Sequence, residues 1–121
     1  NADATWPQAG GEIPDAGAII GALEGCTHRK VELVAGKPSR LVIDFALARL
    51  ERNANECIIV GDSLASDIVM GKRAAQSVKT ALVLTGVTRR EQLVNTCVRP
   101  DFVLESIANV PGLLSQLKLS G

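Results

Sequence analysis

Residues 57–67 read CIIVGDSLASD, and this stretch decides the fold. Its first four residues form a short apolar run that Gly61 and Asp62 end. Such a run, bounded by a turn signal, is typical of a strand that is buried on both faces. After a brief loop, residues 67–75 return to the spacing of a helix. The stretch therefore predicts a buried strand, a loop and a helix in succession.

The same alternation continues on both sides of this stretch. Ser39 suits the N-cap of a well-buried helix that runs to about Arg52. Its apolar residues are Leu41, Ile43, Phe45, Leu47, Ala48 and Leu50. Downstream we predict a strand at 80–84, a helix at 88–94 capped by Thr88, a strand at 101–104 and a helix at 110–117. This order predicts an α/β fold with a parallel sheet and right-handed crossovers.

The N-terminal third is less regular. Residues 1–12 mix Pro, Gly and Asn without periodicity, so we expect a loop that leads out of an upstream part missing from this chain. Residues 14–25 have apolar residues at helical spacing and predict a short helix. Residues 30–35 alternate and then turn apolar, which predicts a strand that ends at the Gly36-Lys37-Pro38-Ser39 break.

Composition limits the function classes. Hydrophobic residues make up 46% of the chain, so it can bury a core. Thirteen basic and thirteen acidic residues cancel, and no basic stripe carries interleaved aromatics, so we expect no nucleic-acid partner. Three widely spaced cysteines form no CxxC pair, which favours a reducing cytoplasm. No stretch approaches the roughly 20 apolar residues that span a bilayer, so we expect no membrane partner.

Two carboxylates follow the first predicted strand of the sheet. Asp62 lies at the strand tip, and Asp67 lies across a short loop at the start of the next helix. Active sites of parallel sheets lie at this end of the strands. Magnesium is usually held by one or two carboxylates, and the helix start favours a bound anion. The alternative is that Asp62 forms a turn and Asp67 caps a helix.

Lys37 lies on the stiff Gly36-Lys37-Pro38 loop, before the helix that leads into the same strand. A single loop lysine is usually only solvated. The order of lysine, helix, strand and paired carboxylates could nevertheless bring Lys37 to the sheet edge that carries Asp62 and Asp67.

Four segments together resemble the NagD-like subfamily IIA phosphatases of the haloacid dehalogenase (HAD) superfamily, a group that includes phosphoglycolate and 4-nitrophenyl phosphatases. They are GKPS at 36–39, GDSLASDIVMG at 61–71, LVLTGVTRREQL at 82–93 and PDFVLESI at 100–107. Residues 1–30 are similar to the end of the family's cap domain. The resemblance implies the tail of a cap domain at 1–35 and the C-terminal part of a HAD-type, Rossmann-like core at 36–121.

The resemblance also implies a chemistry. Lys37 matches the lysine that steadies the nucleophile and the phosphoryl group, so it is expected to be catalytic and phosphate-binding. Asp62 and Asp67 match the acidic pair that holds Mg²⁺, with Asp62 as the direct ligand and Asp67 nearby or acting through water. In this family an Asp attacks phosphorus, and water hydrolyses the resulting aspartyl-phosphate. The implied substrate of the full-length parent is a small phosphorylated metabolite.

The chain departs from the family pattern in three places. It lacks the DxDGT motif of the nucleophile and the Ser or Thr of the second motif, and residues 75–79 lack the usual Gly and are about two residues longer. We therefore expect a fragment of a magnesium-dependent phosphatase that is nearly inactive alone. The alternative is a non-catalytic half-domain that binds metal or protein; a nucleotide-binding domain is disfavoured because no GxGxxG follows a strand.

Without the nucleophile-bearing strand, one apolar edge of the sheet should be exposed. Exposed edges recruit partners. We therefore expect either a homo-oligomer formed through this edge or a rearranged N-terminal segment that covers it.

Overall fold

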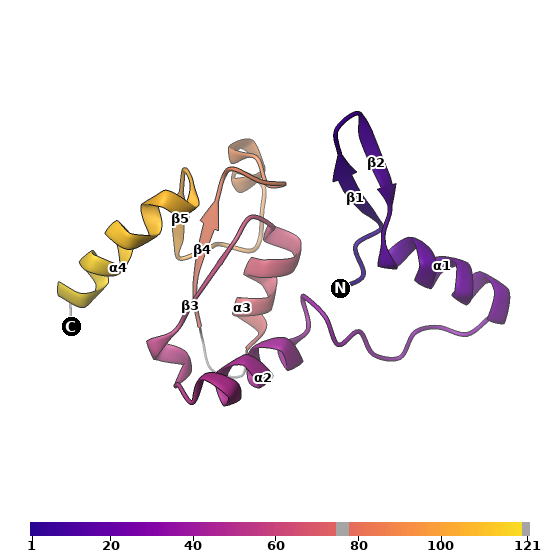
Figure 1. Cartoon of the computed structure of the whole chain (residues 1–121), viewed down its shortest axis with the longest axis horizontal. Helices are drawn as coiled ribbons and strands as arrows, with labels where there is room; N and C mark the ends of the chain where they lie inside the picture. Colours follow the sequence, from indigo (N-terminus) through magenta and orange to yellow (C-terminus); the bar gives the residue numbers. More distant parts are fainter. Residues whose placement is uncertain (75–77, 120–121) are drawn as a thin grey trace.

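The structure is a computed structural model that describes residues 1–74 and 78–119. Its centre is a three-stranded sheet in the order β3 (Ile58–Gly61), β4 (Lys79–Val83) and β5 (Phe102–Leu104), and both strand pairs are parallel. Figure 1 shows this sheet between α3 (Val69–Arg73) on one side and α4 (Val110–Leu119) on the other. The predicted parallel α/β architecture is confirmed.

The core lies around β4 and beneath the helices that cover the sheet. Thr80, Ala81 and Leu82 of β4 are completely buried, because this strand has a neighbour on each side. A second group packs between α2 (Arg40–Leu50), α3 and the strand starts, and consists of Ile43, Ala54, Met70 and Val78. Short apolar strands and short helices thus suffice to fix the positions of the strand tips.

Helix α2 starts as predicted but is not well buried. Ser39 caps it, since its Oγ accepts the N–H of Leu41 at 3.3 Å. Only Ile43 is buried, whereas the side chains of Phe45 and Leu50 are 74% and 61% exposed. The predicted burial is wrong because the apolar residues surround more of the helix than the described part of the chain can cover.

The N-terminal residues form a hairpin and not the predicted loop. Strands β1 (Thr5–Gln8) and β2 (Gly11–Pro14) pair antiparallel in a separate two-stranded sheet. Gly10 and Gly11 have φ of 93° and 152°, a backbone that L side chains rarely adopt, and this permits the tight reversal. Its signal was hidden because each strand has only four residues.

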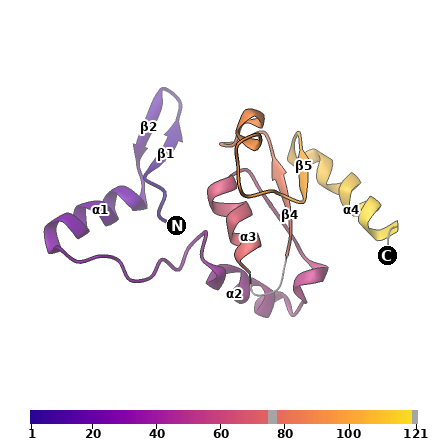
Figure 2. The ribbon, with the colours of Figure 1, turned by 180° about the vertical axis from the view of Figure 1, so that it is seen from behind.

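The remainder of the N-terminal third contains one predicted element and lacks another. Helix α1 (Ala16–Thr27) starts two residues later than predicted, after Asp15, whose Oδ1 accepts the N–H of Ala16 at 2.7 Å. The strand predicted at residues 30–35 is absent, and this segment is an irregular connection in Figures 1 and 2. No strand in the described part of the chain pairs with it.

The segments after β3 and β4 differ in detail from the prediction. Leu64–Ile68 is a π-helical turn that leads into the five-residue α3, and residue 75 of the predicted helix lies outside the described residues. The predicted helix at 88–94 is a 3₁₀ turn, Arg90–Leu93, and the predicted helix at 110–117 is α4. Two further 3₁₀ turns occupy Ala54–Glu56 and Ile107–Asn109.

The outer edge of β3 has no strand beside it in the described part of the chain. Among the described residues the N-terminal segment forms strand pairs only with itself, so it does not extend the sheet at this edge. Self-association through the edge remains a prediction. Within residues 1–74 and 78–119, no helix has the length and apolar character needed to cross a bilayer.

Candidate active site

Asp62 lies at the carboxyl end of β3 and accepts hydrogen bonds from the loop that follows β4. Its Oδ2 accepts the backbone N–H of Val87 at 3.0 Å, and its carbonyl oxygen accepts the N–H of Thr88 at 3.1 Å. Val87 and Thr88 follow β4, the neighbouring parallel strand. The two strand tips are therefore held in one fixed arrangement around the Asp62 carboxylate.

Asp67 reaches back toward the same strand tip because the π-helical turn carries it there. The N–H groups of Asp67 and Ile68 both donate to the carbonyl of Ser63, at 3.0 and 3.1 Å. The Asp67 carboxylate packs on Gly61, where any Cβ would overlap it, and its Oδ2 accepts the N–H of Ser63 at 3.2 Å. Asp67 is 6% exposed, so a buried carboxylate lies directly beside the end of β3.

Lys37 completes the group that the sequence predicted. Its Nζ donates to Oδ1 of Asp67 at 2.8 Å, across 30 residues of chain. This hydrogen bond raises the pKa of Lys37; burial opposes the rise, and the charges of Asp67, Asp62 and Asp3 add to it. Lys37 is therefore a cation throughout the neutral range, held against Asp67.

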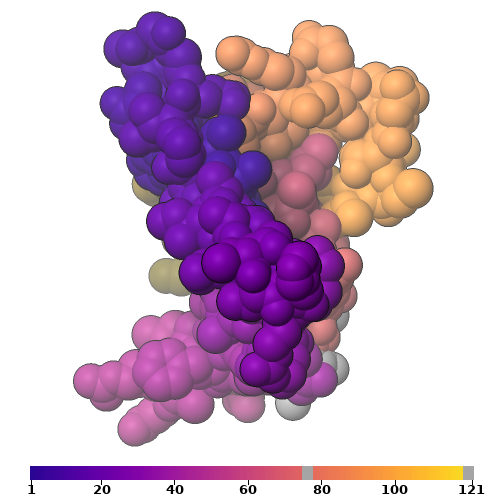
Figure 3. Space-filling view, turned by 90° about the vertical axis from the view of Figure 1, so that its right-hand side faces the viewer, coloured from indigo at the N-terminus to yellow at the C-terminus, as the bar shows by residue number. Residues whose placement is uncertain are grey.

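All three residues line one cleft of about 1010 Å³. Its other wall comes from the N-terminal segment and hairpin, and its rim from the loop after β4. Figure 3 shows the indigo N-terminal hairpin and the orange segment after β4 at the same end of the molecule. The remaining lining residues are Asn1, Asp3, Ala4, Thr5, Trp6, Pro7, Glu12, Ser63, Ser66, Thr85, Gly86, Val87 and Arg89.

Two residues that position Asp62 escaped the sequence analysis. A Cβ at Gly86 would overlap the Asp62 carboxylate, so only glycine permits this approach. Thr88 was predicted to cap a helix, but it is 4% exposed and its Oγ1 accepts the N–H of Leu64 at 3.1 Å. In the sequence, Thr85-Gly86 indicates only the end of a strand. No local pattern predicts that Gly86 approaches Asp62 or that Thr88 binds Leu64, each 24 residues away.

The carboxylate oxygens differ in their availability. Both oxygens of Asp67 accept hydrogen bonds, from Lys37 and Ser63. Oδ1 of Asp62 accepts none from the described residues. The described residues contain no cluster of three or more His, Cys, Asp or Glu side chains that could hold a metal by itself. This set fits Mg²⁺, which is commonly held by one or two carboxylates together with water and substrate phosphate.

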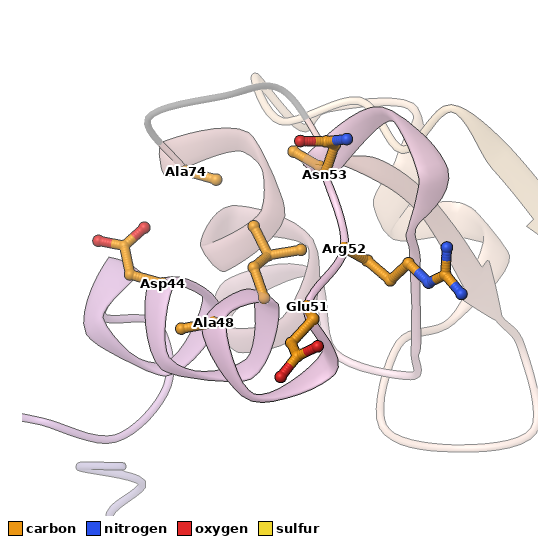
Figure 4. A pocket seen from close by; sticks show the side chains of 8 residues that line it. Asp44, Ala48, Glu51, Arg52, Asn53 and Ala74 are labelled. Carbon is orange, nitrogen blue, oxygen red and sulfur yellow. The ribbon is translucent and has the colours of Figure 1, made fainter.

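A second, smaller cavity of about 380 Å³ lies where α2 ends and approaches α3. Figure 4 shows Asp44 and Ala74 at this cavity, with the Arg52 side chain extending away from them. It contains neither Lys37 nor the two aspartates of the larger cleft. The three predicted site residues therefore lie together in the larger cleft and not in this one.

Comparison with known proteins agrees with this geometry. The profile of the Hydrolase_like family, described as HAD-hydrolase-like, matches residues 34–110, which is more than half of the chain. The sugar-phosphatase AraL of Bacillus subtilis is 43% identical over 117 residues, which cover 96% of this chain and 41% of AraL.

Solved structures show the same relationship. A p-nitrophenyl phosphatase from Archaeoglobus fulgidus superposes with a TM-score of 0.80 at 38% identity, over 93% of this chain and 44% of that one. A glycerol phosphate phosphatase from Mycobacterium tuberculosis, solved in complex with magnesium, gives 0.81 at 30% identity, over 91% and 32%. This chain thus spans less than half the length of each of these proteins. Because the family profile covers all three strands of the parallel sheet and the phosphatases match nearly all of the chain, the chain belongs to the HAD-like hydrolase family.

Proposed function

We propose that the protein carrying this chain is a magnesium-dependent phosphomonoesterase and that residues 1–121 supply its metal-binding and charge-stabilising part. The observation that carries this proposal is the 2.8 Å contact between Lys37 and Asp67, in a cleft that Asp62 also lines. The relatives described above are phosphatases, and they match nearly the whole chain. The substrate class is a small phosphorylated metabolite.

Each of the three side chains has a distinct role in this proposal. Asp62 uses its free Oδ1 as the direct protein ligand of Mg²⁺. Asp67 acts through water and holds the Lys37 ammonium in place. Lys37 in turn stabilises negative charge on the phosphoryl group. The metal, when bound, offsets charge on the phosphate oxygens.

We propose that the nucleophile is an aspartate outside residues 1–121, because this chain contains no DxDGT motif. A carboxylate oxygen bonds to phosphorus, the bond from phosphorus to the ester oxygen breaks, and that oxygen takes a proton from the second aspartate of the same DxDGT motif, which acts as general acid. Water then cleaves the acyl phosphate and releases inorganic phosphate. The 121-residue chain alone is accordingly expected to have almost no turnover.

The test compares single variants in the longest protein that contains this chain. Asp62→Asn, Lys37→Met and Asp67→Asn are each expected to lower kcat for an aryl phosphate by at least about 100-fold, since each removes a charge-stabilising group. Asp44→Asn is the matched control, because Asp44 is exposed on α2 and its ion pair among the described residues is with Arg40.

Two results would contradict the proposal. One is undiminished turnover in Asp62→Asn at saturating Mg²⁺. The other is strong turnover by residues 1–121 alone that Asp62→Ala abolishes, which would place the nucleophile inside this chain.

We also propose that the protein is cytoplasmic. Cys26, Cys57 and Cys97 are free thiols, as expected in a reducing compartment. Cell fractionation tests this, and recovery of the protein outside the cytoplasm would exclude it.

A further inference from the structure

The cleft has more room and more negative charge than a phosphate group accounts for. Its volume of about 1010 Å³ is at the upper end for small-molecule sites, which run from roughly 300 to 1,000 Å³. Four acidic residues line it, Asp3, Glu12, Asp62 and Asp67, and its basic side chains are those of Lys37 and Arg89. A substrate with a second negative charge can therefore be accommodated only beside a cation.

Arg89 is the available cation. Lys37 is held by Asp67, whereas the Arg89 guanidinium has no carboxylate within 4.0 Å among the described residues. The backbone that carries Arg89 is held in place, because the preceding Thr88 is buried and hydrogen-bonded to both Asp62 and Leu64, while the Arg89 side chain is exposed and open to a ligand. An unpaired guanidinium on an anchored loop is suited to bidentate binding of a carboxylate or phosphate.

Resting on the proposed phosphatase function, we propose that Arg89 selects phosphomonoesters whose alcohol part carries a second anionic group. The phosphate to be cleaved lies near Lys37 and the Asp62 site, and the distal carboxylate or phosphate binds Arg89 at the rim. The hairpin wall, with Trp6, closes the opposite side. Monoesters with a neutral alcohol gain nothing from Arg89.

The neighbouring residue provides a matched control. Arg90 forms an ion pair with Glu105 and does not line the cleft. Arg89→Ala and Arg90→Ala therefore remove the same side chain from adjacent positions, and only the first should change substrate preference.

The kinetic test uses three small phosphates with the longest protein that contains this chain: ethyl phosphate, 2-phosphoglycolate and the bisphosphate of ethane-1,2-diol. Arg89→Ala should lower kcat/KM for the last two by about 10- to 100-fold, mainly through KM, because a charge-assisted hydrogen bond is lost. Ethyl phosphate should change less than about threefold, and Arg89→Lys should retain part of the preference. An equal loss on all three substrates, or no loss, would overturn the proposal.

A binding test separates this inference from the proposed function. Trp6 is the one tryptophan of the sequence and lines the cleft, so its fluorescence reports ligands there in residues 1–121 themselves. With Mg²⁺ present, unsubstituted residues 1–121 and the Arg90→Ala variant should bind 2-phosphoglycolate at least about tenfold tighter than ethyl phosphate. The Arg89→Ala variant should bind the two compounds with equal affinity. If the enzyme hydrolyses none of the phosphates, the proposed function fails, and this titration still decides whether Arg89 binds the second anion. Equal affinities in the parent chain would refute that role.

Discussion

Asp101 joins the starts of β4 and β5, and its removal should destabilise the sheet. Its Oδ2 accepts the Thr80 N–H at 2.7 Å and the Thr80 hydroxyl at 2.8 Å, while the Asp101 N–H donates back to Thr80 Oγ1 at 3.2 Å. Lys72 Nζ adds a further contact at 2.7 Å. Thr80 is completely buried, so Asp101→Ala would leave a buried N–H and a hydroxyl without this acceptor.

The size of the loss follows from these contacts. Each buried donor left unsatisfied costs about 1–3 kcal/mol, and the Asp101 side chain is 37% exposed, so water can replace part of what is lost. We take about 1 kcal/mol for each Thr80 donor and about 0.5 kcal/mol for the screened Lys72 pair. Asp101→Ala should therefore lower the free energy of unfolding by about 2–3 kcal/mol and Tm by about 10 °C.

The pH dependence has a defined sign. Burial raises the pKa of Asp101, but the hydrogen bonds from Lys72 and Thr80 outweigh burial and hold this pKa below its ordinary range. The stabilisation is thus present above the unfolded pKa of about 3.9 and is lost as pH falls through the lower folded pKa. The difference between the parent chain and Asp101→Asn should stay constant from about pH 5 to 8 and shrink below about pH 4.

Urea unfolding followed by far-ultraviolet circular dichroism measures both effects. Asp44→Ala is the control, since the Arg40–Asp44 pair is exposed and should contribute less than about 0.5 kcal/mol. The reasoning is refuted if Asp101→Ala is no more destabilising than Asp44→Ala at pH 7, or if the Asp101→Asn difference persists unchanged at pH 3.

Three further changes probe the candidate site. Gly86→Ala should displace the Asp62 carboxylate and weaken Mg²⁺ binding at least about tenfold by calorimetry, whereas Gly21→Ala, with open space around it, should have no such effect. Thr88→Val should lower the free energy of unfolding by about 1 kcal/mol in urea, because it leaves the partly buried N–H of Leu64 without its acceptor; an unchanged value contradicts the anchoring role. Lys37→Met should lower the free energy of unfolding at every pH up to about 10. Above about pH 10 the difference in unfolding free energy between the two proteins should shrink, because the ammonium stops contributing only when pH rises through the raised pKa of Lys37. A difference that vanishes at pH 8 excludes the pair.

Much of the sheet could be read from short segments. The apolar runs that became β3, β4 and β5 each lie within a residue or two of their predicted bounds. Parallel strands separated by helices have their carboxyl ends at one edge, so the positions of Asp62 and Asp67 in the sequence indicated where they would meet. The order of the segments also predicted Lys37 near this edge, where it contacts Asp67, and the resemblance to phosphatases added the roles of the three residues, which remain predictions.

Contacts between distant segments could not be read in this way. The hairpin of residues 5–14 depends on two glycine backbone conformations, and the exposure of Phe45 depends on what surrounds α2. Thr88 and Gly86 matter because the loop after β4 closes onto Asp62, and their local sequence predicts only a turn and a cap.

Periodicity and turn residues act over a few neighbours, and they were enough to specify an α/β chain with acidic residues at a strand tip. Which side chains then touch depends on loop closure and packing over tens of residues, where no local preference chooses the partner. The order of the segments predicted that Lys37 could reach the edge of Asp62 and Asp67, but tertiary packing decided that its ammonium contacts Asp67. Tertiary packing also decided that Asp62 binds the loop after β4 and that Arg89 lines the cleft without a partner among the described carboxylates.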